Sequence, residues 1–575
     1  MKKLFILLAL VMLTATNALA YYSFEVDGIY YLILSDNVSV GVTNNTNNSY
    51  SGKVVIPEKV TRNDKTYTVT TILESTFYKC TNLTEVVIPN SVTTIQSSAF
   101  KNCPKLEKVT MSNSVITIKD NVFNQCTALK QISLPNTLTS LGFAAFSECT
   151  SLMQISVPSS VTSIGDQIFW GCTSLAQASI PAGIKQMPFG MFGNCKSLTQ
   201  FTIPNGITTI GMSAFAGCSA LNKISIPNSV TEIQGSAFYG TALTELSLPE
   251  SVTSIGTYVF NDCNKLLKVS SLGSIKVIDT YLFYGCSSLS SVNLPSTLTT
   301  IGDNSFSNCS SLPKLVIPKS VTSLMATAFY GCSALKEIVV DAANATYSSM
   351  GGVVFSKDKT TLVYYPYGKV GATYTIPSGV TTIGTSAFSG QENLTNVTFP
   401  KGVTTIGEDA FSYCTGLTQA NLPEGVTTIE YSAFWNCTGL KQITLPSTLT
   451  TMYSSFQQCN NLSKVYCKAK TPIISGSSPF SNTSVESATL YVPIGCKAAY
   501  QAAYGWNEFG TIIEMDFSVT QGDVNGDGQV NVSDVTALIS RILGTASYAD
   551  KVCDINGDGQ VNVSDVTALI ALILG

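Results

Sequence analysis

The chain contains no histidine among its 575 residues, and only 12% of its residues are charged. The absence of imidazole excludes Ser-His-Asp and Cys-His nucleophile systems, histidine-ligated zinc and every histidine general base. Carboxylates, lysine, tyrosine or a cofactor would have to carry any catalysis. The acidic residues are scattered and never recur as the facing carboxylate pair that a glycosidase needs. The sequence therefore predicts a protein that is not an enzyme.

Basic stripes and long apolar runs are scarce as well. The formal net charge is −4, so nucleic acid is not an expected partner. Lys2 and Lys3, the apolar residues 4–13 and the small residues 18–20 form the pattern of a secretory signal. An apolar core of this length is too short to span a bilayer. We expect residues 1–20 to be a signal peptide, and the mature chain to be secreted and not membrane-spanning.

A repeat occupies most of the sequence. A phenylalanine recurs with a period of 23 residues, and its sixteen copies stand at positions 77, 100, 123, 146, 169, 192, 215, 238, 260, 283, 306, 329, 388, 411, 434 and 456. Around each copy the pattern is Leu-x-x-Φ-x-Φ-Pro-x-x-Val-x-x-Ile-Gly-x-x-Ala-Phe-x-x-Cys, where Φ is apolar. A period in the twenties with this leucine spacing is typical of leucine-rich repeats, in which each copy is one coil of a solenoid.

The pattern also predicts the structure of each coil. The segment before Pro alternates apolar and polar residues and is expected to be a strand that Pro ends. The Val-x-x-Ile stretch predicts a second short extended segment, and the Ala-Phe-x-x-Cys stretch predicts a short helical turn. We therefore expect an α/β-type leucine-rich repeat solenoid, made mostly of short parallel strands with short helical turns.

Cysteine is abundant, with 17 residues, and it follows the repeated Phe by three positions in 14 of the 16 copies. Equivalent positions in stacked coils point in parallel, whereas a disulfide needs side chains that converge. We predict a buried column of free thiols that act as small apolar fillers. Occasional bridges or a metal remain alternatives. The pairing of Cys467, Cys496 and Cys553, which lie outside the column, stays open.

The residue between the two apolar strand positions is expected to face solvent. These outward positions are nearly neutral and rich in hydroxyls, and they include Thr110, Ser133, Ser156, Ser179, Thr202 and Ser225. A mixed polar stripe lies two residues earlier and includes Glu85, Lys108, Gln131, Gln154, Gln177 and Gln200. Two interpretations remain open: a solvated surface that keeps a long sheet soluble, or an extended protein-binding face.

The period breaks between Cys332 and Phe388. Two apolar runs, 350–355 and 361–366, are separated by a polar segment, which predicts a β-hairpin insert near residues 340–370. The insert carries Tyr364, Tyr365 and Tyr367. These rings are either a contact site or hairpin packing.

The repeat resembles a known family. The segments Pro89-Asn90-Ser91-Val92-Thr93-Thr94-Ile95 and Ala99-Phe100-x-x-Cys103 are similar to the BspA-like leucine-rich repeats of secreted and surface proteins of host-associated bacteria. The resemblance implies an N-terminal cap over residues 21–70, a solenoid over 71–465 and a C-terminal cap over 466–516. It also implies adhesion to host matrix proteins or cells, without an enzymatic role.

The last fifty residues carry the most specific chemistry. Two segments 31 residues apart place oxygen-bearing side chains at loop positions 1, 3, 5, 9 and 12 of an EF-hand pattern, with Gly at position 6. Position 7 would contribute its backbone carbonyl. The first loop offers Asp523, Asn525, Asp527, Gln529, Asn531 and Asp534, and the second offers Asp554, Asn556, Asp558, Gln560, Asn562 and Asp565. Because calcium prefers six to eight oxygen ligands, we predict two calcium ions.

Each loop runs into one apolar segment, and this paired loop-helix arrangement resembles a type I dockerin over residues 523–575, after a linker at 517–522. The resemblance implies docking onto a cohesin-like domain through loop positions 10 and 11 and the helices. The corresponding candidate contacts are Val532, Ser533, Arg541, Val563, Ser564 and Leu572. Ser540-Arg541 becomes Ala571-Leu572 in the second copy, so the two faces are not equivalent. Docking of the apolar face onto the solenoid, or self-association, remains an alternative.

We predict a secreted, non-catalytic adhesion or protein-binding solenoid at the bacterial surface or outside the cell, attached to a partner by a calcium-binding tail. The alternative is a structural subunit of an extracellular cohesin-dockerin complex whose solenoid recognises a polysaccharide or another component. The sequence leaves open the ligand of the solenoid, the mode of surface attachment and the oligomeric state.

Overall fold

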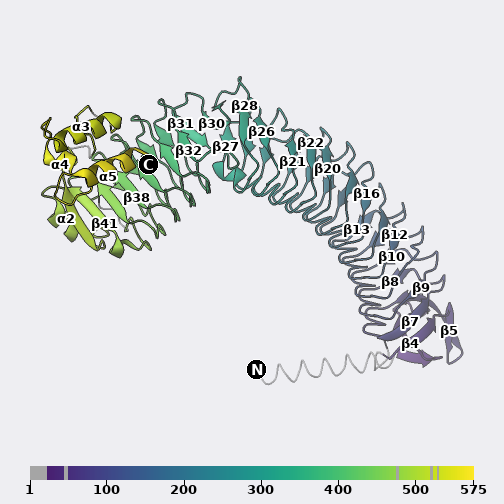
Figure 1. The fold of residues 1–575 in the computed structure, drawn as a ribbon. Coiled ribbons are helices and arrows are strands. Elements are labelled where there is room, and N and C mark those ends of the chain that lie inside the picture. The colour runs from purple at the N-terminus through teal and green to yellow at the C-terminus, as the bar shows by residue number, and fades with distance from the viewer. Residues whose placement is uncertain (1–22, 45–48, 474–477, 519–521, 528–529, 575) are drawn as a thin grey trace, which may run out of the picture. The chain divides into compact units, whose positions relative to one another are not determined.

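The computed structural model describes all residues except 1–22, 45–48, 474–477, 519–521, 528–529 and 575. The expected signal peptide therefore lies outside the described residues. The chain forms two compact units, Met1–Val370 and Gly371–Gly575. Each unit contains stacked coils of parallel strands (Figure 1).

Unit 1 begins with a group of strands that closes the end of its core. Strands β1 (Ser23–Val26), β2 (Ile29–Ile33) and β3 (Ser39–Thr43) form an antiparallel meander, and β5 (Lys59–Arg62) pairs antiparallel with β6 (Lys65–Ile72). β3 then pairs in parallel with β6, and β4 (Ser51–Val55) pairs in parallel with the first strand of the repeats. The change from antiparallel to parallel pairing marks where the coils begin.

Each coil of unit 1 contributes up to two strands. The first row precedes the Pro position and contains β7 (Asn82–Val87), β9 (Lys108–Thr110), β12 (Gln154–Ser156), β14 (Gln177–Ser179), β16 (Gln200–Thr202), β18 (Lys223–Ser225), β20 (Glu245–Leu248), β22 (Lys268–Leu272), β24 (Ser291–Val292), β26 (Lys314–Ile317) and β28 (Glu337–Val340). The second row follows the Pro position and contains β8 (Thr94–Ile95), β10 (Thr117–Ile118), β11 (Ser140–Leu141), β13 (Ser163–Ile164), β15 (Gln186–Met187), β17 (Thr209–Ile210), β19 (Glu232–Ile233), β21 (Ser254–Ile255), β23 (Val277–Ile278), β25 (Thr300–Ile301) and β27 (Ser323–Leu324). Equivalent residues of neighbouring coils pair in register, as Thr117 does with Ser140.

The Ala-Phe-x-x-Cys segments are tandem turns, and within the described repeats a 3-10 helix, η1 (Ala326–Phe329), forms in one of them. The turns cross the left-handed region on both sides of the Phe, as at Asn121 (φ 57°) and Gln125 (φ 64°). Positive φ values stop a right-handed helix from continuing. The backbone instead bonds to the next coil, where the Phe100 amide donates to the Val122 carbonyl at 2.9 Å.

The repeated phenylalanines stack along the core of each unit. Ring centroids lie from 4.9 Å apart for Phe77 and Phe100 to 5.9 Å apart for Phe306 and Phe329 in unit 1. The rings are buried. Burial of one such ring contributes about 1.5–3 kcal/mol, and an aromatic pair adds about 0.5–1.5 kcal/mol. Stacking therefore supplies the core that no single coil has.

The cysteine column lies beside the phenylalanines. All 17 cysteines are thiols, which confirms the prediction for the column and shows no disulfide at Cys467, Cys496 or Cys553. The thiol of one coil donates to the Phe carbonyl of the preceding coil, as Cys172 Sγ does to the Phe146 carbonyl at 3.1 Å. Burial raises the pKa of Cys172 to about 12, so the neutral donor form persists at physiological pH. The prediction that these thiols act as apolar fillers did not include this hydrogen bond.

The region expected to form a hairpin contains three antiparallel strands, β29 (Tyr347–Met350), β30 (Val353–Ser356) and β31 (Thr361–Tyr364). The turn between β30 and β31 is held by Asp358, which accepts hydrogen bonds from Ser356 Oγ at 2.6 Å and the Thr360 amide at 3.1 Å. Tyr364 and Tyr365 are buried, which corresponds to the packing interpretation of these two rings.

Unit 2 continues the same kind of coil. Its first row is β32 (Thr373–Thr375), β34 (Asn396–Thr398), β36 (Gln419–Asn421), β38 (Gln442–Leu445) and β40 (Lys464–Cys467), and its second row is β33 (Thr382–Ile383), β35 (Thr405–Ile406), β37 (Thr428–Ile429) and β39 (Thr451–Met452). The sheet ends with β41 (Thr489–Pro493) and β42 (Thr511–Met515), joined by helix α2 (Lys497–Ala502), with η2 (Val485–Ser487) before β41. Trp506 is fully buried at this end.

The tail of unit 2 is helical and has its own small core. It contains α3 (Val532–Ile542), α4 (Asp550–Cys553) and α5 (Val563–Leu574). Helices α3 and α5 pack against each other. Six buried residues form the core, namely Val524, Ala537, Leu538, Cys553, Ile555 and Leu569. No described helix of the protein is both long and apolar enough to cross a membrane.

Candidate functional site

The first loop of the tail brings three carboxylates together. Single oxygen atoms of Asp523, Asp527 and Asp534 all lie within 4.8 Å of one another. Asp534 is fully buried, and its two oxygens accept hydrogen bonds from the amides of Asn525 at 3.1 Å and Asn531 at 2.9 Å. Asn531 caps α3 in turn by accepting from the Ser533 amide at 2.8 Å. The loop and the start of the helix are thus built from one capping box.

The second loop repeats this construction at its helical end. Asp565 is fully buried and accepts from the amides of Ile555 at 2.8 Å and Asn562 at 2.8 Å. Asp554 instead faces its own loop and accepts from the amides of Gly557 at 2.8 Å and Gly559 at 2.9 Å. Gly559 has φ +83°, a conformation that side chains rarely adopt, as loop position 6 requires. Among the described residues, a cluster of three carboxylates forms in the first loop and not in the second.

The donor set of the first loop fits a hard divalent cation. Three carboxylates within one small volume repel one another unless a cation neutralises them. The remaining predicted ligands of this loop are amide oxygens, which suit calcium. Gln529, the predicted carbonyl ligand, lies outside the described residues. Gln560 is its described counterpart in the second loop and is exposed.

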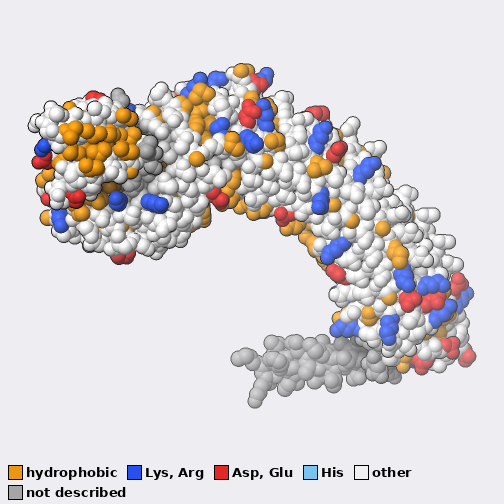
Figure 2. Space-filling model, viewed as in Figure 1, with side chains coloured by type: hydrophobic (Ala, Val, Ile, Leu, Met, Phe, Trp, Pro, Cys, Tyr) orange, Lys and Arg blue, Asp and Glu red, His pale blue; other side chains and the backbone are white. Residues whose placement is uncertain are grey.

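Apolar side chains are exposed on both long helices of the tail. Val532 and Val563, at loop position 10, are 71% and 69% exposed. Ile539 and Ile570, seven residues further on, are both 41% exposed. Equal exposure at equivalent positions shows that the two copies present related faces, and Figure 2 shows hydrophobic side chains gathered on the tail.

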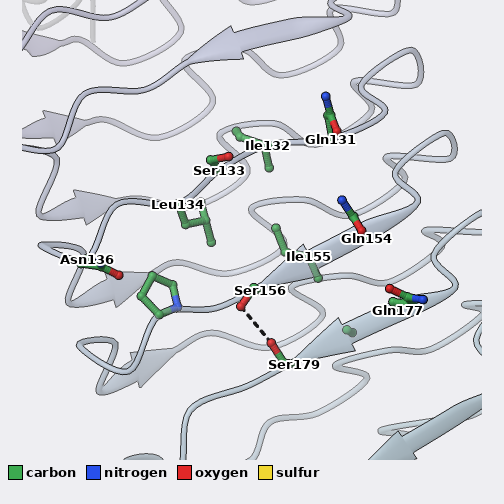
Figure 3. Close-up of a pocket in the computed structure, with 12 residues that line it drawn as sticks. Gln131, Ile132, Ser133, Leu134, Asn136, Gln154, Ile155, Ser156, Gln177 and Ser179 are labelled. Carbon is green, nitrogen blue, oxygen red and sulfur yellow. Dashed lines mark hydrogen bonds between the residues drawn. The ribbon is translucent and has the colours of Figure 1, made fainter.

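A second feature lies on the strand face of unit 1. A shallow hollow of about 590 Å³ crosses three coils at Gln131, Gln154 and Gln177 (Figure 3). Its other polar groups include Ser156 and Ser179, whose hydroxyls hydrogen-bond at 3.0 Å. The outward positions of these residues were predicted from the sequence, but the hollow was not.

Segments of this chain match the sequence profiles of two known families. Residues 58–176, 139–267, 265–367 and 367–487 match the profile described as "BspA type Leucine rich repeat region (6 copies)". These segments cover most of the chain. The chain belongs to the BspA type leucine rich repeat family. Residues 521–574 match the profile of the Dockerin type I domain.

Solved structures of similar chains include several bacterial proteins. A protein from Bacteroides ovatus is 28% identical, with 77% of this chain and 94% of that chain covered at a TM-score of 0.45. The T. pallidum leucine rich repeat protein is 23% identical, with 42% and 90% covered at a TM-score of 0.30. The pneumococcal vaccine antigen PcpA is 20% identical, with 86% and 98% covered at a TM-score of 0.38. No curated protein matches this chain significantly.

The two family matches indicate general properties of the protein. Leucine-rich repeats of this type and dockerins are generally non-catalytic, and they are typical of extracellular or cell-surface bacterial proteins. Repeats of this kind suggest protein binding, and a dockerin suggests docking to a cohesin partner. Dockerin type I domains generally bind calcium.

The candidate docking residues of the dockerin differ in availability. Leu572 is 53% exposed. Ser533 and Ser564 are exposed but also tied to their loops, since each hydroxyl accepts from an asparagine amide, at 2.8 Å and 2.7 Å. Arg541 is engaged within the dockerin, where Nη2 lies 2.6 Å from Asp550 Oδ1 and Nε donates to the Tyr548 carbonyl at 3.1 Å.

Three further apolar residues of the same faces are exposed but were not among the predicted contacts, namely Ile539, Leu543 and Ile570. Leu543 is 72% exposed. A signal was present, because these residues follow loop position 10 at helical spacings of seven and eleven. The apolar strip therefore extends along each helix from the loop.

Proposed function

We propose that this chain is a secreted, non-catalytic adhesion and protein-binding solenoid whose dockerin tail docks it to a cohesin-like partner. The observation that carries the proposal is the first loop, where three carboxylates converge within 4.8 Å directly before a helix with an exposed apolar face. The cation site and the docking face share one short segment. Ordering of the loop by a cation would therefore order the docking face.

Two calcium ions fit this proposal. Asp523, Asn525, Asp527, Asn531 and Asp534 would hold the first ion with the carbonyl of Gln529. The equivalent residues Asp554, Asn556, Asp558, Asn562 and Asp565 would hold the second with the carbonyl of Gln560. Bound calcium would neutralise the carboxylates and fix the loop backbone. Asp534 and Asp565 keep both oxygens on loop amides, so they tie each loop to its helix.

The docking contact would be mainly apolar. Val532 and Val563 lead the two faces, and Ile539 and Ile570 continue them. A few fully desolvated side chains usually carry most of the energy of such an interface. Leu572 adds exposed apolar surface to the second helix where the first has Arg541, so the second helix is the more apolar of the two.

The solenoid would present its nearly neutral strand face to a host matrix protein or another extracellular protein. We propose the division into signal peptide (1–20), N-terminal cap (21–70), solenoid (71–465), C-terminal cap (466–516), linker (517–522) and dockerin (523–575). Mass spectrometry of protein recovered from the culture medium tests export, with a mature N-terminus expected near Tyr21.

Calorimetry on the full chain tests the docking proposal. We expect two calcium ions to bind, followed by saturable binding of at least one member of a panel of cohesin domains in calcium and none in chelator. The Asp534→Ala variant is expected to lose one ion, whereas Asp550→Asn, a carboxylate change outside the loops, is expected to keep both. Calcium binding without any cohesin partner would contradict the docking role and leave the tail as a structural module.

A further inference from the structure

The hollow on unit 1 lies beside a small residue of the strand row. The inward apolar position of the first strand row is Val109, Ile132, Ile155, Ala178 and Phe201 in consecutive coils. Ile132 and Ile155 are buried, while Ala178 is half-buried. The hollow of about 590 Å³ includes Ala178 in its lining, together with the outward Ser156 and Ser179.

The sheet is also interrupted here. Strand β12 pairs with β14, but no described pairing joins residues 131–133 to the coils before or after them. Met153 donates to the Lys130 carbonyl at 3.0 Å and keeps the coils adjacent. Met153 is itself 53% exposed beside a second hollow, which shares Gln131, Gln154 and Gln177 with the first. The two hollows together form one groove that crosses three coils.

Three glutamine side chains supply the polar amides of the groove. The exposed amides of Gln131, Gln154 and Gln177 lie on successive coils (Figure 3), and the structure records no side-chain hydrogen bond for them within its described residues. The same strand position behaves differently in unit 2, where Gln442 Nε2 donates to Gln419 Oε1 at 2.8 Å. Each amide offers two donors and an acceptor. The groove thus presents a row of hydrogen-bonding groups that its own structure does not use.

The lining of the first hollow favours a neutral ligand. No charged side chain lines the first hollow, and Lys130 stands at the edge of the second. A charged chain would lack the partners that its desolvation requires. The exposed Met153 side chain suits a ligand that also has an apolar face.

The spacing of the groups favours a glycan over a peptide. Neighbouring strands of a sheet lie about 4.7–4.9 Å apart, whereas side chains on one face of an extended peptide recur every two residues, or about 6.6–6.8 Å. A peptide along the coils would lose register with the amides within three coils. A linear chain of pyranose rings advances by one sugar over roughly one coil, and each ring combines an apolar C–H face with hydroxyls that both donate and accept.

We propose that the groove formed by Gln131, Gln154, Gln177 and Met153 binds an uncharged linear oligosaccharide that lies along the stacked coils. The glutamine amides bond the hydroxyls, and a sugar ring packs on the Met153 side chain. This site belongs to the solenoid and does not depend on the docking proposal for the tail.

Calorimetry of the full chain with cellohexaose, xylohexaose, mannohexaose and laminarihexaose tests the proposal, with hexagalacturonate and a neutral Ser/Gln/Thr octapeptide as competitors of other classes. We expect at least one neutral hexasaccharide to bind and to keep its affinity in chelator. The Gln154→Ala/Gln177→Ala variant is expected to bind about tenfold more weakly, since two hydrogen-bonding groups are lost. The matched variant Gln419→Ala/Gln442→Ala, at the bonded pair of unit 2, is expected to bind as the original chain does.

A second variant tests the apolar contact. Met153→Ser removes the exposed apolar side chain of the groove, and it is expected to weaken saccharide binding while the thermal unfolding temperature stays close to that of the original chain. If this variant unfolds, the exposed glutamine pair still decides the matter. The proposal is overturned if none of the four neutral hexasaccharides binds, if both glutamine variants bind equally, or if hexagalacturonate or the octapeptide alone binds.

Discussion

The solenoid and the dockerin tail reach order by opposite means. A solenoid coil buries a phenylalanine and a neutral thiol against the equivalent residues of the next coil, as Phe215 does 5.5 Å from Phe238. The dockerin has a buried apolar core of six residues and places fully buried Asp534 and Asp565 beside it. The first arrangement is complete within the chain, whereas the second leaves negative charge for a cation to neutralise.

Because of this difference, the solenoid and the dockerin should be destabilised by different conditions and substitutions. The order of the solenoid depends on neutral groups that must stay neutral and on rings that must stay in place. The order of the dockerin depends on carboxylates that must stay charged and on an ion from solution. Conditions and substitutions that affect one region should therefore leave the other unchanged.

Alkaline pH is expected to have the largest effect, and to act on the solenoid. Burial raises the pKa of Cys172, Cys218 and Cys414 to about 12 from an ordinary value of 9.0. The stability that neutral thiols provide is fully present below pH 9 and is lost as pH rises through the folded value. At pH 10 each such thiol costs about 1.4 kcal/mol relative to neutral pH. Denaturant unfolding followed at pH 8 and pH 10 measures the sum.

The dockerin provides the internal control for this pH effect because it carries one cysteine, the buried Cys553. Its calcium-loaded form is expected to respond less over the same interval. Equal stability of the solenoid at pH 8 and pH 10 would contradict the role given to the thiol column.

The next largest effect is expected from a substitution in the ring stack. Phe215→Ala removes a fully buried ring between Phe192 and Phe238 and should cost about 3–5 kcal/mol. Tyr239→Ala, at a residue that is 41% exposed in the following coil, is the matched control and should cost less than about 1 kcal/mol. Calcium affinity of the tail should be unchanged in both. A change in calcium affinity would show that the two regions are coupled.

A substitution in the first calcium loop is expected to act on the dockerin alone. Asp534→Ala removes the acceptor of the Asn525 and Asn531 amides and one carboxylate of the converging group, so the tail should lose about 3 kcal/mol. Calcium stoichiometry should fall from two ions to one, as calorimetry would report. Loss of solenoid stability in this variant would contradict the claim that the two regions are stabilised independently.

Arg541→Leu should have the smallest effect on stability. The bridge from Arg541 to Asp550 is short, but the Asp550 side chain is 74% exposed, and exposed pairs contribute about 0–1 kcal/mol. The variant gives the first helix the leucine that the second has at Leu572. Thermal unfolding should change little, and binding to a cohesin that uses the first face should strengthen. A loss above about 2 kcal/mol would assign Arg541 a structural role that this geometry does not support.

The structural features that repeat from coil to coil could be predicted from the sequence. The period, the strand before Pro and the thiol column depend on one coil stacked on an equivalent coil, so the residues of a single copy suffice to predict them. The family assignments were predicted for the same reason. The calcium ligands are likewise confined to short segments, and their roles stay predictions.

Features that depend on differences between neighbouring coils or helices were not predicted. The hollow depends on how the coils that carry Gln131, Gln154 and Gln177 lie beside one another, which no single copy reveals. Arg541 forms an ion pair with Asp550 and donates a hydrogen bond to the Tyr548 carbonyl. Both contacts depend on how the segment between the helices folds, which the local sequence does not show. The turns at Asn121 and Gln125 carry positive φ values, although their local pattern favoured a helical turn.

Hydrogen exchange of the full chain, measured by mass spectrometry in calcium and in chelator, tests the central claim most directly. We predict that amides in residues 523–575 lose their protection when calcium is removed, while the coil amides around the Phe and Cys positions exchange equally slowly in both conditions. Unchanged protection of the tail in chelator would contradict the account, because the dockerin would then be ordered without an ion.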